Sequence, residues 1–224
     1  MGFNAVVANM WFYIFLIGFV LAVPIHFLSV EHNRLETKYG SERGKRIGEV
    51  LGMISGWGFF GFWIGMWLAP QPRFTLPLLQ EVLLVIPVFE TAAFTIPLVH
   101  LVLSIGFALP GAWLGIEGVR KTGLKAAETH RTDKIVTNGV YSLVRHPQYL
   151  GGVLSHAGIV LFLSAWYALL STPLVLLLNF LISWKEEIEL AREFGEEYSS
   201  YQKATPMLLP RLTRPRNDGE SAQV

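Results

Sequence analysis

The segment VRHPQYLGGVLSHAGIVLFLSAWYALLSTPLVLLLNFLISWKEE, residues 144–187, has charged residues only near its two outer ends. Between them lie two apolar runs, about 148–164 and 167–184, separated by a very short break. Each run is close to the length of about 17–20 residues that a helix needs to cross a bilayer. A short connection brings the second helix back beside the first. The segment therefore predicts a helical hairpin whose charged ends, 145–146 and 186–187, meet at one membrane surface.

The rest of the chain has the composition of a membrane protein. Of its 224 residues 52% are hydrophobic and 16% charged, and the mean hydropathy is +0.42. Further apolar runs lie at about 9–29, 48–69 and 94–117. Backbone polar groups have no water partners in lipid, so such runs cross it as helices. We predict an all-α integral membrane fold with five transmembrane helices, a C-terminal helical hairpin and an amphipathic tail helix.

The first apolar run resembles a signal peptide only superficially. Residues 1–9 contain no Lys or Arg, and no small-residue cleavage pattern follows the run. We therefore expect it to be a retained helix. The chain has no cysteine, which excludes disulfides, a thiolate nucleophile and a cysteine-based metal site.

The basic residues are distributed unevenly among the six flanks that five spans create. In chain order these flanks carry 0, 5, 1, 6, 0 and 6 Lys and Arg residues. Because basic loops stay in the cytoplasm, this pattern predicts an N-terminus outside and a C-terminus in the cytoplasm. The loop before Pro147 and the segment after Trp184 would then face the cytoplasm together. A sixth span would invert the alternation.

Two regions outside the spans need separate predictions. Residues 70–97 contain five prolines, which interrupt helices, so we predict that 70–93 is an external loop with a short interfacial or re-entrant piece. Residues 184–201 carry apolar side chains at three- and four-residue steps, typical of an amphipathic helix. Residues 212–224 have the composition of a disordered tail. The chain is thus expected to form one membrane domain, 1–211.

The predicted cytoplasmic surface combines opposite charges. Pro147 suits the first position of a helix, which places Arg145 and His146 at a helix N-terminus that favours an anion. Glu186 and Glu187 would return to the same surface. A ligand that fits has a carboxylate, an ammonium group and a flat ring, and S-adenosylmethionine has all three. A structural Arg–Glu pair that ties the tail to the third loop would explain the same charges, so the residues alone leave both interpretations open.

Two motifs in this region resemble those of a known superfamily. GVYSLVRHPQYLGG (139–152) is followed by KEEIELAREFGEEYSSYQ (185–202). Together they resemble the isoprenylcysteine carboxyl methyltransferase and phospholipid methyltransferase superfamily, with its G-x-Y-x-x-x-R-H-P-x-Y run, Glu-Glu pair and F-G-x-E-Y. The resemblance covers about 130–210. It implies an integral membrane enzyme that binds S-adenosylmethionine at the cytoplasmic face and takes a lipophilic acceptor from the bilayer.

The resemblance also implies which residues hold the cofactor. A backbone contact comes from the segment that begins at Lys134, and Glu186 matches the cofactor-contacting carboxylate more closely than Glu187. Helical geometry alone favours Glu187, so both are retained. Arg145 could hold or neutralise charge beside the cofactor, and no residue is assigned a proton-transfer role. The predicted cofactor-binding residues are Lys134, Ile135, Val136, Tyr141, Arg145, His146, Pro147, Gln148, Tyr149, Glu186 and Glu187.

Two departures from the family pattern concern the acceptor. Enzymes that methylate isoprenylcysteine have a His at the position of Asp133, and a substrate-contacting Arg at the position of Ile182. Without that Arg, an acceptor carboxylate lacks its charge partner, so we expect a lipid or another lipophilic molecule that is not a prenylated cysteine carboxylate. A membrane reductase related to sterol reductases, using NADPH, and a non-catalytic membrane protein of the same fold are the alternatives. We expect no nucleic-acid partner.

Three polar residues lie within predicted spans. His100, His156 and Asn179 could line an acceptor cavity, or equally make hydrogen bonds between helices. His26 and His32 lie far from other ligand types in the sequence. The sequence therefore predicts no metal site.

Overall fold

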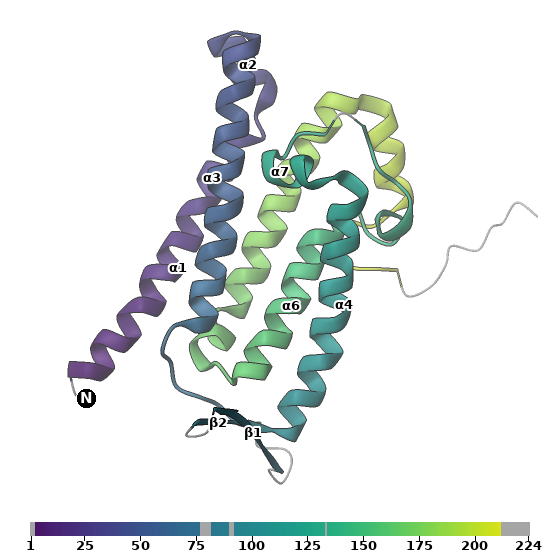
Figure 1. Cartoon of the computed structure of the whole chain (residues 1–224). Coiled ribbons are helices and arrows are strands. Elements are labelled where there is room, and N and C mark those ends of the chain that lie inside the picture. Colours follow the sequence, from purple (N-terminus) through teal and green to yellow (C-terminus); the bar gives the residue numbers. More distant parts are fainter. Residues whose placement is uncertain (1–2, 77–81, 90–91, 133, 212–224) are drawn as a thin grey trace, which may run out of the picture.

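The computed structural model describes residues 3–76, 82–89, 92–132 and 134–211, and it is mostly helical (Figure 1). A two-stranded sheet lies at one end of the helical bundle and a short helix, α2, at the other. The elements in chain order are α1 (Phe3–Ser29), α2 (His32–Tyr39), α3 (Ser41–Leu68), β1 (Leu83–Phe89), β2 (Ala92–Pro97), α4 (Leu98–Thr122), α5 (Leu124–Thr129), the 3₁₀ helix η1 (Gly139–Ser142), α6 (Pro147–Leu163) and α7 (Trp166–Ala204).

Four of the described helices are long and apolar enough to cross a membrane. These are α3, α4, α7 and the part of α1 from Asn9 to Ser29. Helix α6 is equally apolar in character but has 17 residues, so five spans remain a prediction that depends on α6. Large apolar side chains on the outer faces of the helices are exposed, including Ile17, Trp57 and Leu109. Several apolar helices with lipid-compatible surfaces are those of a multi-pass membrane protein.

The helices pack as two close pairs. Helix α1 lies along α3, and α4 lies along α6, while α7 contacts both α6 and α1. The α4–α6 pair depends on small residues, because a Cβ at Gly151 would lie 2.7 Å from the Gly111 carbonyl oxygen. Close backbone approach through glycine is a common way for membrane helices to associate. The larger core cluster, which includes Phe19, Met66 and Val175, fills the space between α1, α3 and α7.

The region after α3 differs from the prediction. Strands β1 and β2 form an antiparallel hairpin in which Leu83 pairs with Pro97, where the sequence predicted a loop with an interfacial or re-entrant piece. The prolines do exclude a helix, but the β-branched and aromatic residues around them favour strands. Pro87 and Pro97 are tolerated because a two-stranded sheet consists only of edges. The fold is therefore mostly helical rather than all-α.

The last long helix continues past the predicted membrane segment. Helix α7 runs to Ala204 and is interrupted at Gly195, whose φ of 57° is outside the helical range. Glycine adopts this conformation without the strain that a Cβ causes. Beyond the break the chain turns back towards η1 (Figure 1), and Tyr201 donates a hydrogen bond to the Tyr141 carbonyl oxygen. The predicted tail, 212–224, lies outside the described residues.

Candidate functional site

A cavity opens at the end of the bundle opposite the sheet. Its empty volume is about 960 Å³, which includes space open to solvent. The loop after α5, the start of α6 and the second half of α7 form its walls, and Val30 and His32 add a further side. The cavity therefore lies where the sequence predicted that the two charged ends would meet.

Ten of the eleven predicted cofactor-binding residues line this cavity, and Glu187 does not. The sequence reasoning thus located one continuous surface, although the binding role of each residue remains a prediction. The ten are Lys134, Ile135, Val136, Tyr141, Arg145, His146, Pro147, Gln148, Tyr149 and Glu186.

His146 is the N-cap residue of α6, and Pro147 occupies the first turn. The His146 imidazole lies between two carboxylates, with Nδ1 3.5 Å from Glu186 Oε2 and Nε2 3.3 Å from Glu187 Oε1. Burial alone would lower the pKa of His146, but hydrogen bonds and charges from Glu186 and Glu187 outweigh burial and raise it. The free backbone N–H groups at this helix N-terminus favour an anionic ligand group.

Arg145 and Glu187 form a buried bidentate pair. Arg145 Nε and Nη2 donate to the two Glu187 carboxylate oxygens at 2.6 and 2.8 Å. The remaining Arg145 nitrogen donates to the carbonyl oxygens of Gln202 and Thr205, which tie the end of α7 to the start of α6. This is the structural Arg–Glu pair that the sequence left open. This pair explains the charges of Arg145 and Glu187, but it does not include Glu186.

Glu186 faces the cavity instead. Its carboxylate accepts a hydrogen bond from the Tyr149 hydroxyl, and Oε1 lies 3.2 Å from His26 Nε2. The side chain is 16% exposed. Of the two adjacent carboxylates, Glu186 lines the cavity and Glu187 does not, and which of them contacts a cofactor stays a prediction.

The opposite wall is neutral and aromatic. Gln148 Nε2 donates to the Tyr141 hydroxyl at 3.1 Å and to Thr122 Oγ1 at 3.2 Å. Burial raises the pKa of Tyr141, so its hydroxyl stays protonated. Among the described residues, the backbone amides of Ile135 and Val136 donate no hydrogen bond. This wall can offer backbone groups and ring faces to a flat heterocycle.

A contact between two histidines beside the cavity was missed from the sequence. His130 lines the cavity, and its ring centroid lies 4.2 Å from that of His26. Burial is the largest cause that lowers the pKa of His130 to about 3, so its imidazole is neutral. The two histidines are about a hundred residues apart in the sequence, so no local pattern predicts their contact. The inference that His26 lies far from other ligand types is wrong in the folded chain. The charge pattern was the one available signal, since it places the end of the first span and the third loop on the same side.

The histidines within the predicted spans make contacts between elements. Trp63 and Trp67 both donate their indole N–H to His156 Nδ1, at 3.0 and 2.9 Å. His100 Nδ1 lies 2.9 Å from Ser164 Oγ, at the connection between α6 and α7. The interhelical interpretation therefore fits both residues better than an acceptor cavity does.

Three further positions named from the sequence are Asn179, Ile182 and Asp133, and the structure describes the first two. Asn179 Nδ2 donates to the Val175 carbonyl oxygen within its own helix, at 2.8 Å. Among the described residues, this amide group therefore makes neither a hydrogen bond between helices nor a contact with the cavity. Ile182 is 2% exposed and belongs to the apolar core. Asp133 lies outside the described residues.

Comparisons with known proteins agree on one superfamily. The family model described as phospholipid methyltransferase matches residues 99–197. A protein-S-isoprenylcysteine O-methyltransferase of Schizosaccharomyces pombe is 28% identical over 120 residues, which cover 48% of this chain and 48% of the relative. Proteins of the same name from Xenopus laevis and Mus musculus are 38% and 34% identical, over 34% and 38% of this chain and 27% and 30% of their own lengths.

These matches are partial, and the family model falls on elements that form the cavity. The chain spans about half the length, or less, of the curated relatives that it matches. The family model nevertheless includes the start of α6 and most of α7, which carry His146 and Glu186. The resemblance of this chain to the superfamily of isoprenylcysteine carboxyl methyltransferases and phospholipid methyltransferases is therefore confirmed over residues 99–197.

Proposed function

We propose that this chain transfers the methyl group of S-adenosylmethionine to a lipophilic acceptor at the cytoplasmic face of a membrane. The observation that carries the proposal is the cavity between the N-terminus of α6 and the Glu186 carboxylate. The superfamily match supports the same reaction, because it is defined by methyltransferases and falls on the elements that form this cavity.

The residues of the cavity fit the chemical groups of S-adenosylmethionine. The N-terminus of α6 at His146 suits the carboxylate of the amino-acid part, and Glu186 suits its ammonium group. The backbone of residues 135–136 and the Tyr141 ring suit the adenine. Bound there, the cofactor would supply an electrophilic methyl group on a sulfonium. The chain itself would orient the cofactor and exclude water, which are the main contributions to an in-line transfer.

We also propose that the cavity end of the bundle faces the cytoplasm. Arg73 lies at the sheet end of the bundle, where it donates a hydrogen bond to the Thr95 carbonyl oxygen. The loops with five and six basic residues include α2 and α5, at the cavity end. Because loops rich in Lys and Arg stay in the cytoplasm, the cavity would be cytoplasmic, and a soluble cofactor could reach it from there.

The acceptor is proposed to lack a carboxylate. Ile182 is enclosed in the apolar core, so its position offers no cation. Two nearby cations that could replace the missing Arg are already paired, Arg145 with Glu187 and Lys185 with Glu31 and Glu189. An unpaired buried carboxylate is strongly disfavoured. A neutral acceptor, or one with a thiol, amine or hydroxyl group, fits this site better.

The direct test is calorimetric titration of detergent-purified protein with S-adenosylmethionine and, separately, with NADPH. We expect stoichiometric binding of S-adenosylmethionine and none of NADPH. His146→Ala should weaken binding roughly ten- to a hundredfold, the effect of losing a charge-assisted hydrogen bond. Binding of NADPH alone would favour the reductase, and binding of neither would favour a non-catalytic protein.

A further inference from the structure

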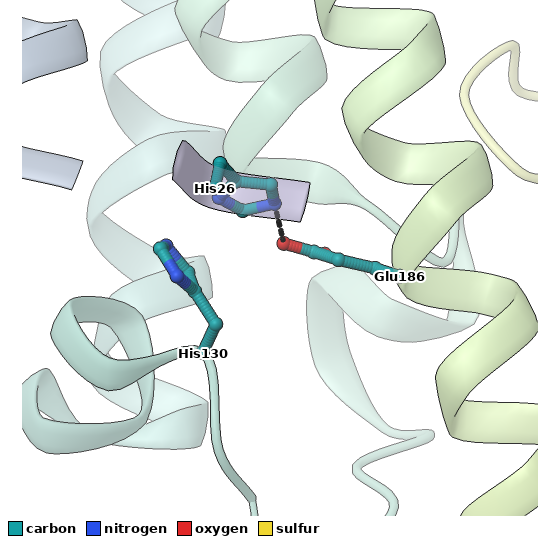
Figure 2. Close-up of side chains that lie close together, drawn as sticks. All are labelled: His26, His130 and Glu186. Atoms are coloured by element: carbon teal, nitrogen blue, oxygen red, sulfur yellow. Dashed lines mark ion pairs between the residues drawn. The ribbon is translucent and has the colours of Figure 1, made fainter. Parts of the chain in front are cut away.

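Three side chains from distant parts of the chain converge beside the cavity (Figure 2). His26 comes from the end of α1, His130 from the loop after α5 and Glu186 from α7. One ligand atom of each lies within 4.8 Å of the other two. Nothing in the local sequence brings these residues together, so the cluster is a product of the tertiary fold.

The backbone around the cluster is closely constrained. His130 has a left-handed conformation, with φ 55°, which is uncommon for a residue with a side chain. A Cβ at Gly52 would lie 2.9 Å from the Thr129 carbonyl oxygen, so α3 accommodates the residue before His130 only because it has a glycine there. Ser29 Oγ lies 3.2 Å from His130 Nδ1. This contact orients the ring and occupies Nδ1, so Nε2 is the nitrogen that remains for a metal ion.

The second histidine has an unsatisfied nitrogen. His26 is 5% exposed, and its buried Nε2 makes no hydrogen bond to any residue that the structure describes. The contact with Glu186 Oε1, 3.2 Å long, has the separation of an ion pair without hydrogen-bond alignment. Donor atoms held about 2.0–2.1 Å from one tetrahedral ion are ~3.3 Å apart. The spacing of these two atoms is therefore that of two ligands of a single metal ion.

We propose that His26, His130 and Glu186 bind one divalent transition-metal ion, and that Zn²⁺ is the ion that this ligand set fits best. Two imidazoles and one carboxylate are the protein ligands of a known class of open zinc sites, which leave the fourth position to water or substrate. Ca²⁺ and Mg²⁺ prefer sites made of oxygen ligands only.

The position of the ion would connect it with the cavity. His130 and Glu186 both line the cavity, whereas His26 does not. An ion held by all three would sit in the cavity wall, with its open position towards the interior. The other Glu186 oxygen, Oε2, faces His146, so the carboxylate can bind the ion through Oε1 and still present Oε2 to the cavity. The inference goes beyond the proposed methyl transfer, because metal binding requires neither cofactor nor acceptor.

Metal content of the purified protein tests the proposal. The chain is produced without a polyhistidine tag, stripped with a chelator, dialysed against Zn²⁺ or Co²⁺, and analysed by plasma mass spectrometry and by visible absorption. We expect one ion for each chain, and a Co²⁺ spectrum of the intense type that tetrahedral sites give. The absence of bound Zn²⁺ and of such a spectrum in the wild type would overturn the proposal, whatever the variants show.

Variants then identify the ligands. His26→Gln and His130→Gln should each weaken Zn²⁺ binding by at least about a hundredfold, since even outer-shell partners of a metal cost 10–100-fold. His32→Gln is the matched control, because His32 also lines the cavity but does not belong to the cluster, and it should bind Zn²⁺ as the wild type does. If His32→Gln lost the ion, or both ligand variants kept it, the assignment would be wrong. Titration of the metal-free wild type with S-adenosylmethionine tests the proposed function separately.

Discussion

The two adjacent glutamates should respond in opposite ways to the same conservative substitution. Glu187→Gln removes the charge from a pair in which Arg145 and Glu187 are 9% and 10% exposed. Leaving one member of a buried pair uncompensated costs about 3–5 kcal/mol, and we expect the lower end because Arg145 keeps two carbonyl partners. About 3 kcal/mol corresponds to a decrease in melting temperature of roughly 6–12 °C for a chain of this size. Affinity for S-adenosylmethionine should change little.

Glu186→Gln should show the reverse. Its carboxylate faces the cavity, so losing the charge removes one charge-assisted hydrogen bond to an ammonium group. That loss corresponds to about 1.5–3 kcal/mol, or roughly ten- to a hundredfold in affinity. The assay combines thermal melts in detergent with calorimetric titration of both variants. If Glu187→Gln bound the cofactor weakly at unchanged stability while Glu186→Gln bound normally, our assignment of the two glutamates would be refuted.

Three further predictions concern topology, packing and the acceptor. In this cysteine-free chain, an impermeant thiol reagent should label Asn4→Cys only from outside and Lys125→Cys only from the cytoplasmic side; cytoplasmic labelling of Asn4→Cys would exclude the five-span arrangement. Gly151→Ala should destabilise the protein by about 1–3 kcal/mol through overpacking against α4, whereas Gly115→Ala, which meets open space, should not, as thermal melts of both will show. With labelled S-adenosylmethionine, components of a lipid extract should be methylated and a farnesylated cysteine analogue should not; efficient methylation of the analogue would mean that another cation replaces the Arg missing at Ile182.

The sequence by itself determined the helical framework and the location of the cavity. The apolar runs at 9–29, 48–69 and 94–117 correspond to α1, α3 and α4, because hydrophobicity and helical hydrogen bonding are properties of short continuous segments. The position of Pro147 predicted the first turn of α6 for the same local reason. The hairpin β1–β2 was missed because its prolines were interpreted only as helix breakers, and strand propensity depends on a pairing partner.

Only the tertiary structure decided which of the two adjacent carboxylates lines the cavity and which is held in a buried pair. Glu186 and Glu187 are neighbours with nearly the same sequence context, and the break at Gly195 is what brings the Gln202 and Thr205 carbonyls to Arg145 and so commits Glu187 to the structural pair. The contact between His26 and Glu186 likewise joins α1 to α7. Such contacts depend on how helices pack and turn in three dimensions, a property that no local pattern of residues contains.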